Sequence, residues 1–425
     1  MKLYLNRRNF IKYSASFIPI SALYLNGCNL FTNQTNSEKI KRIEVVNYKG
    51  PRKTAAHLEI ESTGGKVGVF GTLLWGIPKL MNSLLPKLSE ILINKDPLDR
   101  DLEFSNIWEK LYPNNPLDVY EKGIDPLSEK NIWGTTRGGR HSSTGKIIMC
   151  LSAVDNALWD LRGKILGNPV YNLIGNVNRE QLQVYSRVGE GKDLEVARRI
   201  ARERYDKGQK HQKWYFVYGP KDGKEGMFKN LELVRVLREE LGPDAALMFD
   251  NHSMRFEIGP DWVVQLAKDM MAYDPFWLEE PTAPEDIEGY ARIKGETGIT
   301  MAAGEHHFTR WQIKPMLDRK CIDWVQLDPD WCGGVSEWLK ACDLVMKYQG
   351  VKVVPHCDNF MTNVQCVASQ PESLCPMVEY NDGQTERKMS FRKRVLRPES
   401  EILQTPKEPG LGPDLDHKRI QRIEL

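Results

Sequence analysis

The chain has 425 residues, 41% of them hydrophobic, which is enough for one large domain with its own core and a smaller second domain. It contains 59 lysine and arginine residues against 57 aspartate and glutamate residues, a formal charge of +2. Four of the cations and none of the acids precede Cys28, so the rest of the chain is close to neutral. This balance excludes bulk attraction to nucleic acid or to an anionic lipid surface. The eight cysteines form no CxxC pair, which argues against a disulfide scaffold or a zinc site.

Residues 1–28 are similar to an export signal. A twin arginine, Arg7-Arg8, is followed by an apolar stretch and then by Leu-Asn-Gly-Cys, which ends at Cys28. That order is typical of a twin-arginine signal with a lipoprotein cleavage site, and the polar residues 29–39 would form a tether. We therefore expect an exported, periplasmic protein that meets the membrane only through a lipid anchor at Cys28. An ordinary disordered or amphipathic N-terminus is the alternative.

Residues 40–170 are predicted to form an α+β domain. Turn sequences separate three short alternating patterns, which predicts a three-stranded meander. Helical periodicity follows, then a stretch rich in Asn, Pro, Gly and Arg, and then a second amphipathic helix. The three strands are expected at 42–48, 55–62 and 66–71, the helices at 78–112 and 147–165, and the loop at 113–140.

The most informative pattern is a series of apolar stretches that each stop on an acidic or imidazole side chain. Successive stops are 29, 26, 23 and 28 residues apart, about one strand plus one helix. In a closed barrel of βα units the C-terminal ends of the strands meet at one mouth, so these side chains would converge. Residues 171–380 are therefore predicted to form a barrel, and residues 381–425 to pack on the smaller domain. The stops are Asp250, Glu279, Glu305, Asp328 and His356.

These five side chains suit metal-assisted proton abstraction. The carboxylates of Asp250, Glu279 and Glu305 would form an oxygen cage suited to Mg²⁺. A metal held there could bind a substrate carboxylate and neutralise the charge formed when the α-proton leaves. His356 would be the base, or the acid that protonates a leaving hydroxyl, and Asp328 would orient its imidazole. Singly, each residue also has a structural interpretation, such as a helix N-cap for an aspartate.

The chain resembles the enolase superfamily in its mandelate racemase-like subgroup, and most of all the acid-sugar dehydratases of the rhamnonate and galactonate type. The resemblance implies an α/β fold: a (β/α)7β TIM-like barrel with an α+β capping domain formed by the N-terminal region and the C-terminal tail. It also implies Mg²⁺ ligands at Asp250, Glu279 and Glu305 and a His356–Asp328 dyad. The matching sequences are SAVDNALWDLRGK (152–164), KWYFVYGPKDGKEGM (213–227), LMFDNH (247–252), WLEEP (277–281), GEHH (304–307), DPDWCGG (328–334) and VVPH (353–356).

The second barrel strand departs from the racemase pattern. Racemase-type members carry Lys-x-Lys there, whereas this chain has Lys213 followed by Trp and Tyr215, which weakens the case for a two-base racemisation. Tyr215 could act as an acid, pack, or bind a substrate oxygen, and both residues are kept as catalytic candidates. His252 stands where galactonate- and mannonate-type dehydratases place an imidazole. Together with His356 it would complete the acid–base pair of a dehydration.

Several residues beside these candidates have competing interpretations. His306 follows a predicted ligand and is expected to contact substrate or to brace the metal site. His307 is interpreted as structural, and Glu280 as supporting the metal site without being a ligand. Asp330 is a rival of Asp328 as the partner of the catalytic imidazole.

The cap loops are expected to supply further substrate contacts. Trp75 lies in the second cap loop, and Arg140 in a basic loop that equally fits a surface role. The first cap loop, 48–53, is short, which would leave the mouth open to a larger acidic sugar.

These observations predict a Mg²⁺-dependent lyase that dehydrates a small acidic sugar to a 2-keto-3-deoxy acid, with no nucleic-acid partner. The resemblance further implies a homo-oligomer. An epimerase, racemase or cycloisomerase that uses the same enolate is the nearest alternative. A non-catalytic sugar-acid-binding lipoprotein is the alternative from another class.

Overall fold

The computed structural model describes residues 38–74, 76–111, 145–175, 177–252 and 258–424. Eight parallel strands form a curved sheet in the order β10-β9-β8-β7-β6-β5-β4-β11. The backbone N–H of Val353 in β10 donates to the carbonyl of Leu374, just before β11, at 2.9 Å, so the two ends of the sheet meet. The strands are β4 (Gln181–Glu190), β5 (His211–Tyr215), β6 (Ala246–Asp250), β7 (Trp277–Glu279), β8 (Met301–Ala303), β9 (Trp324–Val325), β10 (Lys352–Val353) and β11 (Met377–Tyr380).

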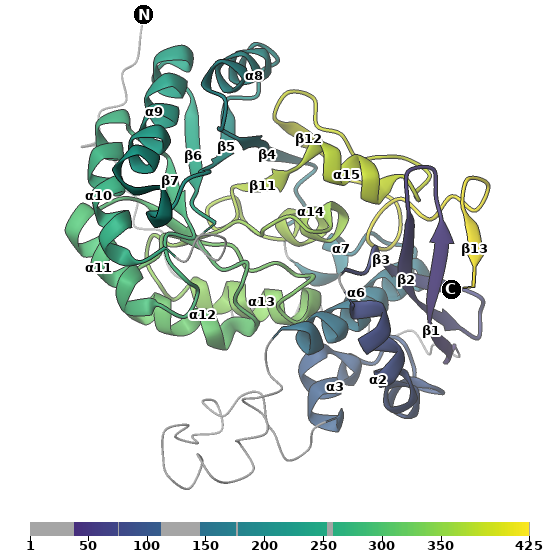
Figure 1. Ribbon diagram of the computed structural model, residues 1–425. Coiled ribbons are helices and arrows are strands. Elements are labelled where there is room, and N and C mark those ends of the chain that lie inside the picture. The colour runs from purple at the N-terminus through teal and green to yellow at the C-terminus, as the bar shows by residue number, and fades with distance from the viewer. Residues whose placement is uncertain (1–37, 75, 112–144, 176, 253–257, 425) are drawn as a thin grey trace, which may run out of the picture.

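A helix follows each of the first seven barrel strands and packs outside the sheet (Figure 1). The short apolar runs suit such strands because both of their faces are buried, as the burial of Leu247, Met248 and Phe249 in β6 illustrates. The alternation confirms the predicted (β/α)7β barrel. The helices are α8 (Leu194–Asp206), α9 (Gly223–Leu241), α10 (Pro260–Met270), α11 (Ile287–Thr297), α12 (Thr309–Asp318), α13 (Gly334–Val345) and α14 (Phe360–Ala368).

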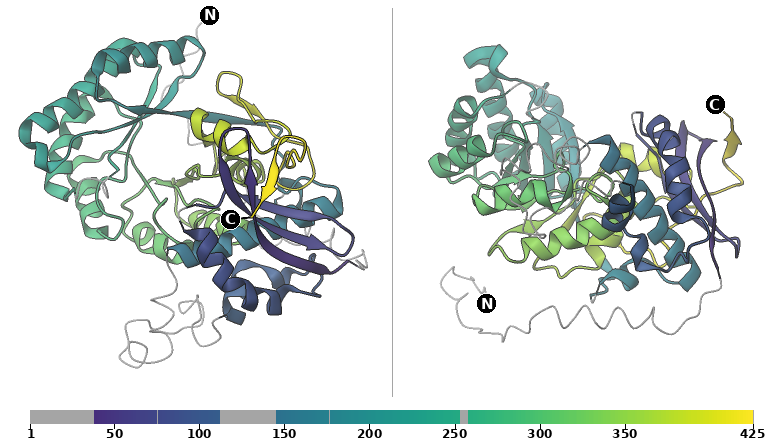
Figure 2. Two further views of the ribbon diagram at one scale, coloured as in Figure 1. Left: turned by 45° about the vertical axis from the view of Figure 1, so that its right-hand side comes forward. Right: turned by 90° about the horizontal axis from the view of Figure 1, so that it is seen from below.

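The N-terminal part forms the cap sheet, in which the predicted meander of β1, β2 and β3 is antiparallel. The C-terminal strand β13 pairs with β1 at the outer edge of this sheet (Figure 2). The region 78–112, predicted to be helical, holds two helices. The first ends at Leu92, after which Ile93 is extended and Asn94 has a φ of 64°, and the second begins at Phe104. The elements are β1 (Ile40–Lys49), β2 (Thr54–Ser62), β3 (Val67–Gly71), β13 (Gln421–Ile423), α2 (Ile77–Leu92), α3 (Phe104–Leu111) and α6 (Lys146–Leu166).

Helix α6 fixes the cap on the barrel, because it packs against β3 on one side and against α13 on the other. Its Trp159 indole donates to Ser336 Oγ at 2.9 Å, and its Asp155 carboxylate accepts the Ser336 backbone N–H at 2.9 Å. A Cβ at Gly68 in β3 would lie 2.1 Å from the Ala157 carbonyl oxygen, so only glycine permits this approach. The cap is thereby held against helix α13 of the barrel.

Three sequence predictions fall on residues that the structure does not describe. The export signal and the anchor at Cys28 lie outside the described residues, as does the loop predicted at 113–140. Among the residues that the structure describes, no helix is long and apolar enough to cross a membrane. Seven cysteines are described, and all seven are buried free thiols, as their apolar surroundings in the sequence favour.

Candidate active site at the mouth of the barrel

The five predicted strand-end residues come together at the C-terminal edge of the barrel sheet. Asp250 and Glu279 are the last residues of β6 and β7 and are paired in the strand register. Glu305, Asp328 and His356 follow the ends of β8, β9 and β10 by two or three residues. All five side chains are buried. The rule that strand ends converge at one mouth therefore placed every member of the set correctly.

Lys213 lies at the centre of the buried carboxylates. Its Nζ is 2.5 Å from Glu279 Oε1, 2.9 Å from Glu379 Oε1 and 3.7 Å from Asp250 Oδ2. The second oxygen of Glu279 accepts the Trp277 indole N–H at 3.0 Å. Burial alone would lower the pKa of Lys213, but Glu279 and Glu379 outweigh it and raise the pKa well above its usual value. Lys213 is therefore held as a cation among these carboxylates.

The acidic residues around this lysine fit a divalent cation. Burial raises the pKa of Asp250 well above its usual value, and the charges of Glu279 and Glu305 raise it further, so additional positive charge would be stabilising there. Ligand atoms of Glu280, Glu305 and His306 also lie within 4.8 Å of one another. His306 Nδ1 is 2.6 Å from Glu280 Oε1 and 3.5 Å from Glu305 Oε1. The structure thus adds Glu280 and His306 to the groups that could hold a metal, and carboxylate oxygens suit Mg²⁺.

The His356 imidazole is braced by Asp328. Its Nδ1 is 3.0 Å from Asp328 Oδ2, whereas Asp330, the rival partner, has its carboxylate oxygen 3.2 Å from the amide nitrogen of Asn156. Burial alone would lower the pKa of His356, but Glu305 and Asp328 outweigh it and raise the pKa to about 10. The Nε2 atom is 3.8 Å from Glu305 Oε2, so the imidazole connects the dyad to the acidic cluster.

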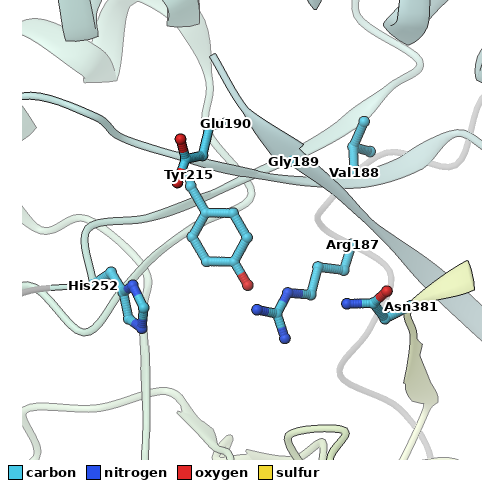
Figure 3. A pocket seen from close by; sticks show the side chains of 7 residues that line it. All are labelled: Arg187, Val188, Gly189, Glu190, Tyr215, His252 and Asn381. Carbon is cyan, nitrogen blue, oxygen red and sulfur yellow. The ribbon is translucent and has the colours of Figure 1, made fainter. Parts of the chain in front are cut away.

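A pocket of about 260 Å³ opens beside this cluster (Figure 3). The guanidinium of Arg187 lies 4.9 Å from the centre of the Tyr215 ring, and the imidazole of His252 lies 5.6 Å from it. Burial raises the pKa of Tyr215 well above its usual value, with Lys213 and Arg187 acting in the opposite direction, so its hydroxyl stays protonated. The pocket is lined by Arg187, Val188, Gly189, Glu190, Tyr215, His252 and Asn381.

The other predicted residues have mixed outcomes. Trp75 and Arg140 lie outside the described residues. His307 is buried with Nε2 3.1 Å from the Pro284 carbonyl, and burial lowers its pKa to about 4, which fits the structural interpretation. Sequence reasoning missed Arg187 and Glu379, which lie within β4 and β11 and do not end an apolar run.

Comparisons with known proteins agree with this architecture. The family described as "Enolase C-terminal domain-like" matches residues 195–419, and the family "Mandelate racemase / muconate lactonizing enzyme, N-terminal domain" matches residues 123–175. An L-rhamnonate dehydratase from Saccharopolyspora erythraea is 32% identical over 303 residues, which cover 70% of this chain and 74% of that protein. A D-galactonate dehydratase from Cronobacter sakazakii is 25% identical over 381 residues, which cover 85% and 89%.

Solved structures share the fold. The 3,6-anhydro-D-galactonate cycloisomerase from Zobellia galactanivorans superposes with a TM-score of 0.71 at 24% identity, over 89% of this chain and 97% of that one. A member of the enolase superfamily from Salmonella Typhimurium superposes with a TM-score of 0.73 at 20% identity, over 91% and 100%.

Proposed function

The chain belongs to the enolase superfamily and is an enzyme similar to its acid-sugar dehydratases, and on that premise we propose that it dehydrates a sugar acid with the help of Mg²⁺. It would remove the α-proton, pass through an enediolate and expel the β-hydroxyl to give a 2-keto-3-deoxy acid. The observation that carries this proposal is the braced His356 beside a buried acidic cluster, next to a pocket that presents His252. The two dehydratases among its relatives support the same reaction class.

The acidic cluster would hold the metal through Asp250, Glu279 and Glu305. The raised pKa of buried Asp250 beside two further carboxylates is the structural reason to expect a cation there. Bound Mg²⁺ would neutralise the second negative charge that develops on a substrate carboxylate when the α-proton leaves.

The chain's own side chains would then move the protons. Asp328 holds the imidazole of His356 through Nδ1, which leaves Nε2 to exchange a proton with the substrate. His252 would serve as the second acid–base group, and Tyr215, kept protonated by burial, would donate a hydrogen bond to a substrate oxygen. Lys213 is held by Glu279 and Glu379, and Tyr215 stands where the racemase pattern has its second lysine, and both features favour dehydration over a lysine-assisted racemisation.

Arg187 fits the recognition of an acidic substrate. Its guanidinium lines the pocket beside Tyr215, so the pocket contains a positive charge. A guanidinium pairs well with the carboxylate oxygens of an acidic substrate. We propose a small acidic sugar as the substrate. Contacts from His306, Trp75 and Arg140, assembly as a homo-oligomer, export to the periplasm and the lipid anchor at Cys28 stay predictions.

The alternatives use the same site differently. An epimerase or cycloisomerase would share the enolate and release no water, and a cycloisomerase is among the structures with this fold. A protein that only binds sugar acids would need neither the braced His356 nor His252. Product mass separates the first alternative, because dehydration loses one water.

Proton NMR in D₂O on a panel of sugar acids tests the proposal, with the protein lacking residues 1–28, with Mg²⁺, and with EDTA as the control. We expect the C2 proton signal of one substrate to disappear as a 2-keto-3-deoxy product forms, only when Mg²⁺ is present. Exchange without water loss would indicate an epimerase or racemase. Silence across the panel together with measurable sugar-acid binding would favour the binding protein.

A further inference from the structure

The tail of the chain reaches the catalytic dyad through helix α15 (Asp382–Met389), which follows β11. Lys388, near its C-terminal end, is only 7% exposed. Its ammonium donates to the Asp358 carbonyl oxygen at 2.7 Å and also contacts the Asp358 carboxylate. Gln384, one turn earlier, donates to the same carboxylate at 3.0 Å. Two side chains of α15 therefore fix one aspartate.

That aspartate is in turn bonded to the dyad. The backbone N–H of Asp358 donates to Asp328 Oδ2 at 2.9 Å. The same oxygen atom lies 3.0 Å from His356 Nδ1. A displacement of Asp358 would therefore remove one of the two donors that set the direction of this oxygen.

The charges around the dyad explain why a lysine is needed there. Asp328, Asp330 and Asp358 lie together at the mouth. Burial raises the pKa of both Asp328 and Asp330, the charge of Asp358 raises both further, and Lys388 opposes the rise at Asp330. Removing one partner of a buried ion pair leaves the other charge uncompensated, and the structure then relaxes to hydrate it. Without Lys388, Asp358 would be expected to turn toward water.

We propose that Lys388 is a positioning residue for His356, acting through Asp358 and Asp328. This inference rests on the proposed function only in so far as His356 is the group that transfers the proton. The tail of the chain, predicted to pack on the cap, would then also determine the orientation of the imidazole. Small displacements of a reacting group are costly in catalysis, so we expect Lys388→Met to lower kcat by about 10- to 100-fold with KM unchanged.

The test is the Nδ1–H signal of His356 in protein labelled with ¹⁵N-histidine, assigned by its disappearance in His356→Asn. Lys388→Met should shift or broaden this signal, and Lys388→Arg, which keeps the cation, should restore it. Lys393→Met, at an exposed lysine of the same tail, is the matched control and should leave the signal unchanged. An unchanged signal in a folded Lys388→Met protein would overturn the proposal.

A second variant covers the case in which Lys388→Met does not fold. Combining Lys388→Met with Asp358→Asn removes both charges and leaves no uncompensated ion. Because the Lys388 contact is still lost and only Gln384 then holds residue 358 from α15, we expect the His356 signal to remain displaced, and a wild-type signal would overturn the proposal. The NMR signal does not depend on activity. It therefore tests the positioning role of Lys388 even if the proposed lyase reaction is not found.

Discussion

The mouth of the barrel and the sheet of the cap each bury a histidine, yet they favour opposite protonation states. In the cap, burial lowers the pKa of His57 to about 3, and the nearby Arg392 acts in the same direction. Its ring packs against Phe391 with centroids 4.9 Å apart. At the mouth, the same desolvation acts on His356, but Glu305 and Asp328 reverse it and raise the pKa to about 10.

The difference shows that the neighbouring charges, and not the depth of burial, decide what a buried imidazole does. Among apolar rings and a cation, a histidine is a neutral packing residue. Among carboxylates, it is a proton carrier whose charge is tied to theirs. The predictions below alter one side of this contrast at a time.

Replacing the imidazole at the mouth should have the largest effect. We expect His356→Asn to lower kcat by roughly 10²- to 10⁴-fold, the range typical of acid–base catalysis. Among the described residues, Asp328 holds no other imidazole that could take over the proton transfer. The measurement is formation of the 2-keto-3-deoxy product. His417→Asn, at an exposed histidine in the tail, should keep wild-type activity, and an active His356→Asn enzyme would refute the assigned role.

Removing the ammonium group of Lys213 from among the carboxylates should have the second largest effect. Lys213→Met leaves Asp250, Glu279 and Glu379 without their ammonium partner, so we expect the metal-free protein to lose about 3–5 kcal/mol of stability. Added Mg²⁺ should recover more of the melting temperature in this variant than in wild type, because it supplies the missing positive charge.

Thermal unfolding with EDTA and with Mg²⁺ measures both effects of Lys213→Met. Lys229→Met, at an exposed lysine of α9 paired with Glu225, is the control and should change neither melting temperature appreciably. Equal Mg²⁺-induced shifts in wild type and Lys213→Met would show that the carboxylates around Lys213 do not hold the metal.

Sequence reasoning predicted those residues of the mouth that follow from the regular alternation of strands and helices in the barrel. The apolar runs stop at Asp250, the last residue of β6, and at His356, three residues past the end of β10, and the topology then brings these stops together. Arg187 was missed because it does not follow the end of an apolar run: it lies inside β4, which continues to Glu190 past a register shift. The connection of Lys388 to the dyad through Asp358 depends on how the tail folds back, which no local pattern in the sequence determines.

The second histidine at the mouth should contribute less than the first. His252 lies beside Tyr215 in the open pocket, and we expect His252→Asn to lower kcat by about 10²-fold, at the low end for acid–base catalysis. If the two histidines transfer different protons, only one of the two variants should retain deuterium exchange at C2 without water loss. His211→Asn, at the opposite end of β5, is the control. Identical exchange behaviour in both variants would contradict the division of roles.

The smallest effect concerns the cap. His57 has a folded pKa below its unfolded value of about 6.5, so the unfolded chain binds its proton first as the pH falls. The stability that the neutral ring contributes is therefore fully present above pH 6.5 and is lost progressively toward pH 3. Relative to His57→Gln, which cannot titrate, the wild type should lose about 2 kcal/mol between pH 7 and pH 5.

Urea unfolding of wild type and His57→Gln at pH 7 and pH 5 measures this loss. A packing difference between the two side chains changes the free energy of unfolding by the same amount at both pH values, so it cancels in the comparison. The contribution of carboxylates that titrate in both proteins cancels as well. His417→Gln, at an exposed position, should show no such pH-dependent difference. If the gap between wild type and His57→Gln were the same at both pH values, burial beside Arg392 would not be keeping His57 neutral. The contrast with His356 would then lie only in the carboxylates at the mouth.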